Sequence, residues 1–332
     1  MESRAVRFLL TAVLVAALGL AGAGYLWVHS PIALSQPVVD VSIDPGSSAR
    51  DVASQLSQAG VNAPPSALYW WFRLSGQSRA IKAGSYEFTE GTTPASLLRK
   101  LVQGDEALRT VTLLEGWNIR QVRDALRKAA FLQQATQALD NAELMAQLGR
   151  PGVHPEGRFF PDTYTYAKGS TDLALLKRAM HAMDQRLDAA WSQRNPRLPL
   201  QSADQALILA SIIEKETGRA NEQAQISAVF NNRLSIGMRL QTDPTVIYGL
   251  GVAFDGNLRK VDLLTDTPYN SYTRTGLPPT PISMPGKSAL LAAVQPAASR
   301  ALYFVARGDG SSHFSESLDE HNRAVNKYQR GQ

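Results

Sequence analysis

The sequence contains no cysteine, which excludes disulfide bonds, a thiol nucleophile and cysteine zinc sites. The same absence excludes a lipid-modified N-terminal cysteine. Histidine is scarce as well: there are five, and no two stand at a metal-ligand spacing such as H-x-x-x-H. We therefore expect no metal site and no cofactor.

Clustered positive charge is also missing from this chain of 332 residues, which has room for two domains beside a targeting segment. The formal net charge is +5, but the basic residues are scattered and form no Lys/Arg block. Nucleic-acid-binding domains usually carry a clustered basic footprint, so this distribution argues against nucleic acid as a partner. It suits an anionic surface, such as phospholipid or cell-wall polymer.

Residues 8–28 contain no charged side chain at all. At 1.5 Å of rise per residue the run spans about 30 Å, the thickness of the hydrocarbon core of a bilayer. Arg4 and Arg7 flank its N-terminal end, and Tyr25 and Trp27 fall where an interfacial aromatic belt lies. We therefore predict a transmembrane helix over these residues.

The positive-inside rule places the tail, residues 1–7, in the cytoplasm and the bulk of the chain outside. The alternative is a cleaved signal peptide, with Ala-Gly-Ala at 21–23 as the cleavage site. The apolar run is long for a signal peptide and its aromatic residues suit an anchor, so we favour the uncleaved helix.

A Pro-containing linker over residues 29–40 leads into a pattern that occurs three times: Gly, a cap residue at +2, an aliphatic residue at +6 and Leu at +10. The copies begin at Gly46, Gly91 and Gly116, and strand-like runs precede them at 38–43, 85–88 and 111–114. Each copy predicts a strand, a glycine turn, an N-cap and a short helix. Small units of this kind resemble LysM-type wall-binding modules, and a pure packing scaffold explains them equally well.

Residues 67–74 form a predicted helix in which Trp70, Trp71 and Phe72 either stack on sugar rings or belong to the core. Residues 119–150 and 171–192 also have helical composition. The turn-rich segment between these two, residues 155–164, marks the entry to a second domain. The predicted organisation is therefore a repeat region over 41–150 and a second domain over 151–332.

The segment Ala206–Thr217 is the expected central helix of the second domain. Its first eight residues are apolar or small on every side, which is typical of a helix inside a domain. The helix then runs into Glu214 and Glu216, with Lys215 between them. A carboxyl group on the end of a buried helix loses water, and desolvation raises its pKa. A carboxylic acid that stays protonated near neutral pH is suited to be a general acid.

The two glutamates are two residues apart, so their side chains point about 200° apart. Glu216 continues the apolar stripe of Ala206, Leu209 and Ile213, which favours it as the buried acid. The alternative is that both glutamates are exposed at a helix end and paired with Lys215 or Arg219.

Loops rich in Pro, Gly, Asn and Tyr follow a predicted helix at 222–234, and they suit a neutral, polyhydroxylated ligand such as a glycan. We expect a hairpin from 302–305 and 313–315, and a terminal helix at 318–328.

Six stretches of the second domain carry a resemblance to a known protein family. They are Ala-Ser-Ile-Ile-Glu-Lys-Glu-Thr (210–217), Val-Phe-Asn-Asn-Arg-Leu (229–234), Met-Arg-Leu-Gln-Thr-Asp-Pro-Thr-Val-Ile-Tyr-Gly (238–249), Tyr-Asn-Ser-Tyr with Thr-Gly-Leu-Pro-Pro (269–279), Glu-Gly-Arg-Phe-Phe-Pro-Asp-Thr-Tyr (156–164) and Leu-Tyr-Phe-Val (302–305).

With these motifs the chain resembles the YceG-like family, the MltG endolytic murein transglycosylases, over nearly its whole length. The resemblance implies an α+β protein: an N-terminal transmembrane helix in the bacterial inner membrane, a small LysM-like α/β subdomain and a mixed α+β catalytic domain in the periplasm. It implies cleavage of MurNAc–GlcNAc bonds within peptidoglycan strands to give 1,6-anhydroMurNAc ends. The expected partners are glycan strands, the membrane and peptidoglycan synthases.

In the family the catalytic glutamate lies in the Glu-Lys-Glu segment, and we assign it to Glu216, with Glu214 as the alternative. Asp243 is a candidate second carboxylate, or only a turn residue before Pro244. The candidates for holding the glycan strand are Gln241, Thr242, Tyr248, Tyr269 and Asn270.

Two other functions stay open from the sequence. Hydrolases usually place two carboxylates around the bond, so Asp243 and Glu216 together also fit a muramidase-type hydrolase. A membrane-tethered wall-binding scaffold, with structural glutamates, is the non-enzymatic alternative.

Overall fold

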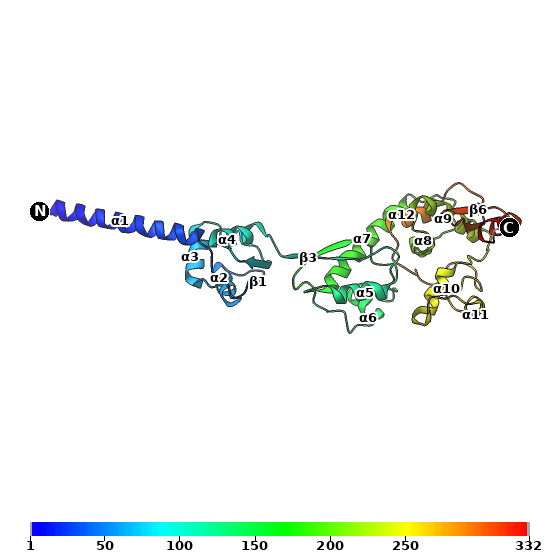
Figure 1. Ribbon diagram of the computed structural model, residues 1–332, viewed down its shortest axis with the longest axis horizontal. Helices are drawn as coiled ribbons and strands as arrows, with labels where there is room; N and C mark the ends of the chain where they lie inside the picture. The colour runs from blue at the N-terminus through cyan, green and yellow to red at the C-terminus, as the bar shows by residue number, and fades with distance from the viewer. Residues whose placement is uncertain (1, 331–332) are drawn as a thin grey trace. The chain divides into compact units, whose positions relative to one another are not determined.

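The computed structural model describes residues 2–330, which divide into two compact units (Figure 1). Within the described residues, unit 1 comprises 2–109 with 166–169, and unit 2 comprises 110–165 with 170–330. We expected the boundary near residue 150. The observed boundary lies earlier because the third repeat packs within unit 2, where the amide of Ile119 donates to the buried carboxylate of Glu156 at 3.1 Å.

Unit 1 begins with helix α1, Glu2–His29. Within it, Phe8–His29 is long and apolar enough to cross a membrane, and none of its apolar window is buried within the protein. This range matches the predicted span within one residue at its end. A signal sequence passes the same test, so the choice between anchor and signal peptide rests on the sequence arguments above.

After α1, unit 1 is a small α/β unit. Strand β1, Val38–Ile43, pairs antiparallel with β2, Gly84–Thr89, from Val38 opposite Thr89 to Ile43 opposite Gly84. Helices α2 (Ala49–Gln58) and α3 (Pro65–Leu74) connect these strands, and α4 (Pro94–Gln103) follows β2. The helices are amphipathic, and their apolar faces form one core with the inner face of the sheet.

The structure confirms the predicted glycine turn, N-cap and helix in all three repeats, whereas the third strand, expected at 111–114, lies at 108–112. Gly46, Gly91 and Gly116 have φ of 83°, 86° and 75°, a region that side chains with a Cβ rarely adopt. Each glycine precedes an N-cap that bonds the backbone of the first helical turn within a capping box; the caps are Ser48 of α2, Thr93 of α4 and Asn118 of α5 (Ile119–Lys128). The repeats are therefore equivalent in local structure, although two lie in unit 1 and one in unit 2.

The predicted helical stretch 119–150 is partly wrong, because the chain is irregular between α5 and α6 (Asn141–Gln147). Asp172, which is 2% exposed, stabilises the irregular segment by accepting from the amides of Ala135 and Thr136 at 2.9 and 3.1 Å. Amides held by a carboxylate cannot at the same time continue a helix.

Strands β3 (Leu108–Thr112) and β4 (Thr163–Ala167) pair with one another, and the boundary between the units runs through both. Helix α7, Asp172–Ser192, follows as predicted. Helices α8 (Ala203–Glu216) and α9 (Ala220–Ser235) come next in the chain.

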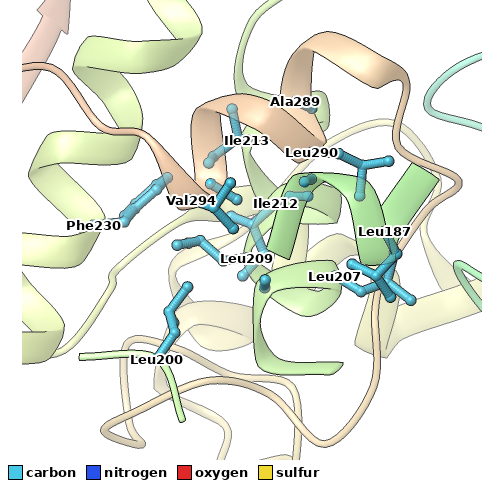
Figure 2. Packing of buried hydrophobic residues seen from close by; sticks show 14 of the residues in the cluster. Leu187, Leu200, Leu207, Leu209, Ile212, Ile213, Phe230, Ala289, Leu290 and Val294 are labelled. Carbon is cyan, nitrogen blue, oxygen red and sulfur yellow. The ribbon is translucent and has the colours of Figure 1, made fainter. Parts of the chain in front are cut away.

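The core of unit 2 forms around α8, as its composition predicts. Leu209, Ile212 and Ile213 are each 0% exposed. Figure 2 shows Leu209 and Ile212 between Phe230 of α9 and Leu290 of α12. Helix α12 spans Lys287–Val294 and was not predicted from the sequence.

The rest of unit 2 surrounds the end of α8. The segment 238–249, which was expected to be a loop, contains most of α10, Asp243–Leu250. Pro244 lies in the first turn of this helix, where its missing N–H removes no intrahelical hydrogen bond. A short 3-10 turn and α11, Lys260–Leu264, follow. The predicted hairpin and terminal helix are confirmed as β5 (Tyr303–Ala306), β6 (Ser312–Ser315) and α13 (Leu318–Gln329).

Candidate active site

Glu216, the last residue of α8, lines a cleft of about 610 Å³ in unit 2. The walls come from the N-terminus of α10, from β5 and from α13. The polar side chains of this cleft are those of Glu216, Arg233, Gln241, Thr242, Asp243, Tyr272, Tyr303, His321 and Gln329. A carboxyl group, a cation and several amide and hydroxyl groups therefore converge where a polyhydroxylated ligand fits.

The carboxyl group of Glu216 is largely removed from water. Burial is the main cause that raises its pKa, and the negative charge of Asp243 raises it further. The hydroxyl of Thr242 donates to Oε1 in a short hydrogen bond and, with the charge of Arg233, opposes the shift. The balance favours the protonated acid at a higher pH than for a glutamate in water.

The segment beside Glu216 has a constrained backbone. Gln241 has φ of +50°, an uncommon conformation for a residue with a side chain, and its amide donates to the carbonyl of Ser271 at 3.1 Å. Thr242 is 2% exposed, and its amide donates to the Ser271 hydroxyl at 3.0 Å. Strained residues of this kind cluster at functional sites. The hydrogen bonds with Ser271 fix the hydroxyl that contacts Glu216.

Arg233 of α9 connects two walls of the cleft. It is 7% exposed and donates from Nε to the carbonyl of Leu302 and from Nη1 to that of Leu240, both at 2.6 Å. Its guanidinium lies 5.3 Å from the centre of the Tyr303 ring. Burial lowers its pKa from the usual value for arginine. The motif at 229–234 contains Arg233, but its role could not be recognised without the loops that it contacts.

Asp243 is exposed in the same cleft and accepts from the hydroxyl of Tyr272 at 2.6 Å. Burial and this carboxylate raise the pKa of Tyr272, so the phenol stays a donor. The structure therefore brings the predicted second carboxylate to the mouth of the site, with a tyrosine partner that sequence analysis had not singled out.

Glu214 lies in different surroundings. Its Oε2 accepts from the backbone amide of Gly286 at 2.9 Å. Burial is the main cause that raises its pKa; the Gly286 amide opposes the shift and the charge of Glu115 adds to it. Glu214 is not among the described residues that line the cleft of Glu216.

The alternative of two exposed ion pairs at the helix end is wrong. Both glutamates are half-buried, and the neighbouring cations bind backbone carbonyls instead. Lys215 donates to Gly116 at 3.3 Å, and Arg219 donates to Asp309 at 2.9 Å.

Three predicted glycan contacts lie elsewhere. Tyr248 donates its hydroxyl to Glu156 at 3.0 Å and packs edge-on against Tyr269, with ring centres 4.9 Å apart. Asn270 is 0% exposed, and its amide donates to the carbonyls of Asp262, Leu263 and Thr265. This placement makes Asn270 a support of the loop rather than a surface contact.

Glu156 is a buried carboxyl group that sequence reasoning missed, and it is not among the described residues that line the cleft. It is 0% exposed and accepts from the amide of Ile119 and the hydroxyl of Tyr248. Burial raises its pKa to about 7. Its motif, Glu-Gly-Arg-Phe-Phe-Pro, was noted but interpreted only as a turn. In residues 2–330, no three His, Cys, Asp or Glu side chains are grouped to hold a metal ion.

Comparisons with known proteins agree on one family. The profile of the YceG-like family matches residues 41–327. An endolytic murein transglycosylase of Bacillus subtilis is 32% identical over 311 residues, which cover 89% of this chain and 86% of that protein. One of Streptococcus pneumoniae is 25% identical, over 91% of this chain and 61% of its own length. A crystal structure of a YceG-like protein from Listeria monocytogenes is similar with a TM-score of 0.54 and 29% identity, over 87% of this chain and 99% of that chain.

Proposed function

This chain belongs to the YceG-like family, and we propose that it is an endolytic murein transglycosylase, a lyase that cuts peptidoglycan strands internally. The names of the relatives in Bacillus and Streptococcus support the reaction class. The observation that carries the assignment within this molecule is a single half-buried glutamate, Glu216, with a raised pKa on the wall of a polar cleft.

The reaction needs one carboxyl group in two protonation states. Protonated Glu216 donates its proton to the glycosidic oxygen while the bond from C1 of MurNAc to that oxygen breaks. The resulting carboxylate accepts the proton of the MurNAc 6-hydroxyl as O6 bonds to C1. The products are a strand ending in 1,6-anhydroMurNAc and a strand beginning with GlcNAc, and no water is consumed. Glu216 ends the cycle protonated, as it began.

Neighbouring residues hold Glu216 in position for both steps. Because Thr242 donates to Oε1, Oε2 is the oxygen that carries the proton toward the substrate. The same hydrogen bond stabilises the carboxylate formed between the steps. Among the neutral side chains that line the cleft, we propose that Gln241 and Tyr272 contact sugar hydroxyls.

Mass spectrometry of purified sacculi after digestion tests this function. Anhydro-ended muropeptides are expected. Reducing ends would instead mean that Asp243 and water act as in a hydrolase, and intact glycan would mean a non-catalytic scaffold.

We further propose that Phe8–His29 anchors the protein once in the inner membrane, with the N-terminus in the cytoplasm and the rest in the periplasm. The uncharged run, Arg4 and Arg7 support this orientation. A reporter fused after Gln332 should be active only outside the cytoplasm, and the full-length protein should stay in the membrane fraction. A soluble form that begins near Gly24 would contradict the anchor.

For unit 1 we propose a LysM-like module that binds the wall. The antiparallel pair β1–β2, connected through α2 and α3, supports the comparison. Residues 38–105 should pellet with purified sacculi, and no retention above that of a control protein would leave unit 1 as a scaffold. Contacts with peptidoglycan synthases stay a prediction.

A further inference from the structure

A groove lies within unit 1, between the end of α1 and helix α3, and the proposed catalysis does not use it. Its volume is about 460 Å³ and its lining is almost entirely apolar. Leu20 and Trp27 of α1 line one side, and Ala67, Trp70 and Leu74 of α3 line the other. The last turns of the membrane-spanning candidate and α3 therefore share one apolar surface.

Core contacts hold this end of α1 in place within unit 1. Val28 is 7% exposed, and Trp27 packs against the unit's core. Directly after α1, the amide of Ile32 donates to the carbonyl of Thr92 at 2.8 Å. These contacts attach the last turns of α1 to the same core on which α3 packs.

The length of α1 sets how far lipid extends along it. The segment Phe8–His29 spans about 33 Å, enough to fill a hydrocarbon core of about 30 Å. Leu20 lies about 13 Å from His29 along the helix axis, and the groove shared with α3 reaches it. A bilayer that surrounds α1 up to its end therefore also reaches the outer face of α3.

That face of α3 is apolar although it lies outside the core. Trp70 is 59% exposed and Leu74 is 80% exposed, and their spacing of four residues places them on one side of the helix. Leu68 and Phe72, on the opposite side, are 0% exposed in the core. An exposed apolar face on a helix whose other side is fully packed marks an interaction site.

The charge around α3 suits an anionic lipid surface. Residues 52–86 contain Arg73, Arg79 and Lys82 and no acidic side chain. Basic residues on an interfacial helix are attracted to anionic headgroups in either leaflet, and tryptophan concentrates at the membrane–water interface. The basic charge without acidic residues is not expected of a surface that binds a neutral sugar.

We propose that α3 is an interfacial helix, which inserts Trp70 and Leu74 into the headgroup–acyl boundary beside α1 and directs Arg73 and Arg79 toward lipid phosphates. The proposal rests on the membrane anchor of the proposed function and adds a second lipid contact within unit 1. It replaces sugar stacking as the role of Trp70.

The absence of cysteine permits a direct test with single labelled positions. Full-length L14C, L74C and L264C would each carry an environment-sensitive NBD dye in vesicles of phosphatidylethanolamine and phosphatidylglycerol with doxyl-labelled lipid. Leu14 lies within α1, and Leu264, at 68% exposed, is a matched leucine on unit 2. We expect emission at position 74 to be blue-shifted and quenched severalfold more strongly by doxyl lipid than emission at position 264. Thermal melts confirm that each labelled protein is folded.

The position-14 label separates the two possible failures. Lipid quenching at 14 with water-like emission at 74 would overturn the proposal and leave the anchor standing. Water-like emission at both positions would overturn the anchor and the proposal together. Concentration-dependent energy transfer between two position-74 labels, or shielding of this label only by glycan fragments, would identify a second copy or a sugar as the occupant and would also overturn the proposal.

Discussion

Glu216 and Glu214 leave the same helix on nearly opposite sides and enter two different environments. On the side of Glu216, a threonine hydroxyl binds one carboxyl oxygen and a cleft of about 610 Å³ opens in front of it. On the side of Glu214, the Gly286 backbone closes over the carboxyl group. Burial raises the pKa of both groups. A raised pKa alone therefore does not identify the acid, because the acid must also face space for the substrate.

The surroundings of Gly286 show how tightly the Glu214 side is filled. A Cβ at Gly286 would lie 1.8 Å from Oε1 of Glu115, far closer than two non-bonded heavy atoms approach. A larger residue at position 286 would therefore require the side chain of Glu115 to move. The difference between the surroundings of Glu216 and Glu214 predicts a different effect on activity or stability for each of four substitutions.

The largest effect is expected for Glu216→Gln. The amide keeps the shape of the side chain but removes the proton to be donated, and general acid catalysis typically contributes 10²–10⁴-fold. Formation of anhydro-ended products by the purified variant should fall by roughly that factor, with an unchanged thermal melt. Near-normal activity would place the acid elsewhere.

Glu156→Gln extends the comparison to a carboxyl group with no access to solvent. Its pKa of about 7 lies above the unfolded value, so the folded state binds the proton more tightly. The contribution to stability is complete below about pH 4.5 and is lost as pH rises through 7, by about 3 kcal/mol in total. Melts between pH 4.5 and 7.5 should decline with pH in the wild type and be flatter in the variant. Equal slopes would mean that Glu156 titrates normally.

Asp243→Asn tests whether the second carboxylate tunes the acid or replaces it. Because the charge of Asp243 raises the pKa of Glu216, its removal should lower that pKa. The alkaline limb of the kcat/KM profile should then move to lower pH, with most of the maximal rate retained. A loss of rate at every pH would instead indicate a catalytic base and a hydrolytic reaction.

The smallest effect is expected for Glu214→Gln, the matched control for Glu216→Gln. The glutamine carbonyl can still accept from the Gly286 amide, so the product yield should stay close to wild type. Loss of activity in this variant, with activity retained in Glu216→Gln, would exchange the roles of the two glutamates.

Much of the fold follows from local sequence signals. The glycine–cap–aliphatic pattern predicted three turns and three helix starts, because a left-handed glycine and a capping side chain act within a few residues. The buried helix α8 was equally predictable, since no face of it is polar. Helix α12 was missed, and the break after α5 was missed because the stabilising carboxylate, Asp172, is distant in sequence.

The sequence singled out four residues that line the cleft, Glu216, Gln241, Thr242 and Asp243, but it did not predict the geometry that brings them together. The apolar stripe favoured Glu216, yet α8 is buried on all sides, so the stripe does not distinguish the two glutamates. The difference comes from Thr242 and Gly286, which reach α8 from other parts of the chain. Asn270 has the residue type of a sugar ligand, but three nearby carbonyls use its amide.

The guanidinium of Arg233 also ties two walls of the cleft to one another. It donates to the carbonyls of Leu240 and Leu302. These two hydrogen bonds connect the edge of the C-terminal hairpin with the segment that positions Thr242. Neither segment can detach without leaving a buried cation short of acceptors, which is costly. The two should therefore open as one cooperative unit. In hydrogen-exchange experiments, the amides of residues 241–243, 245 and 303–306 should then exchange at a common rate, slower than that of the exposed turn at Gly308.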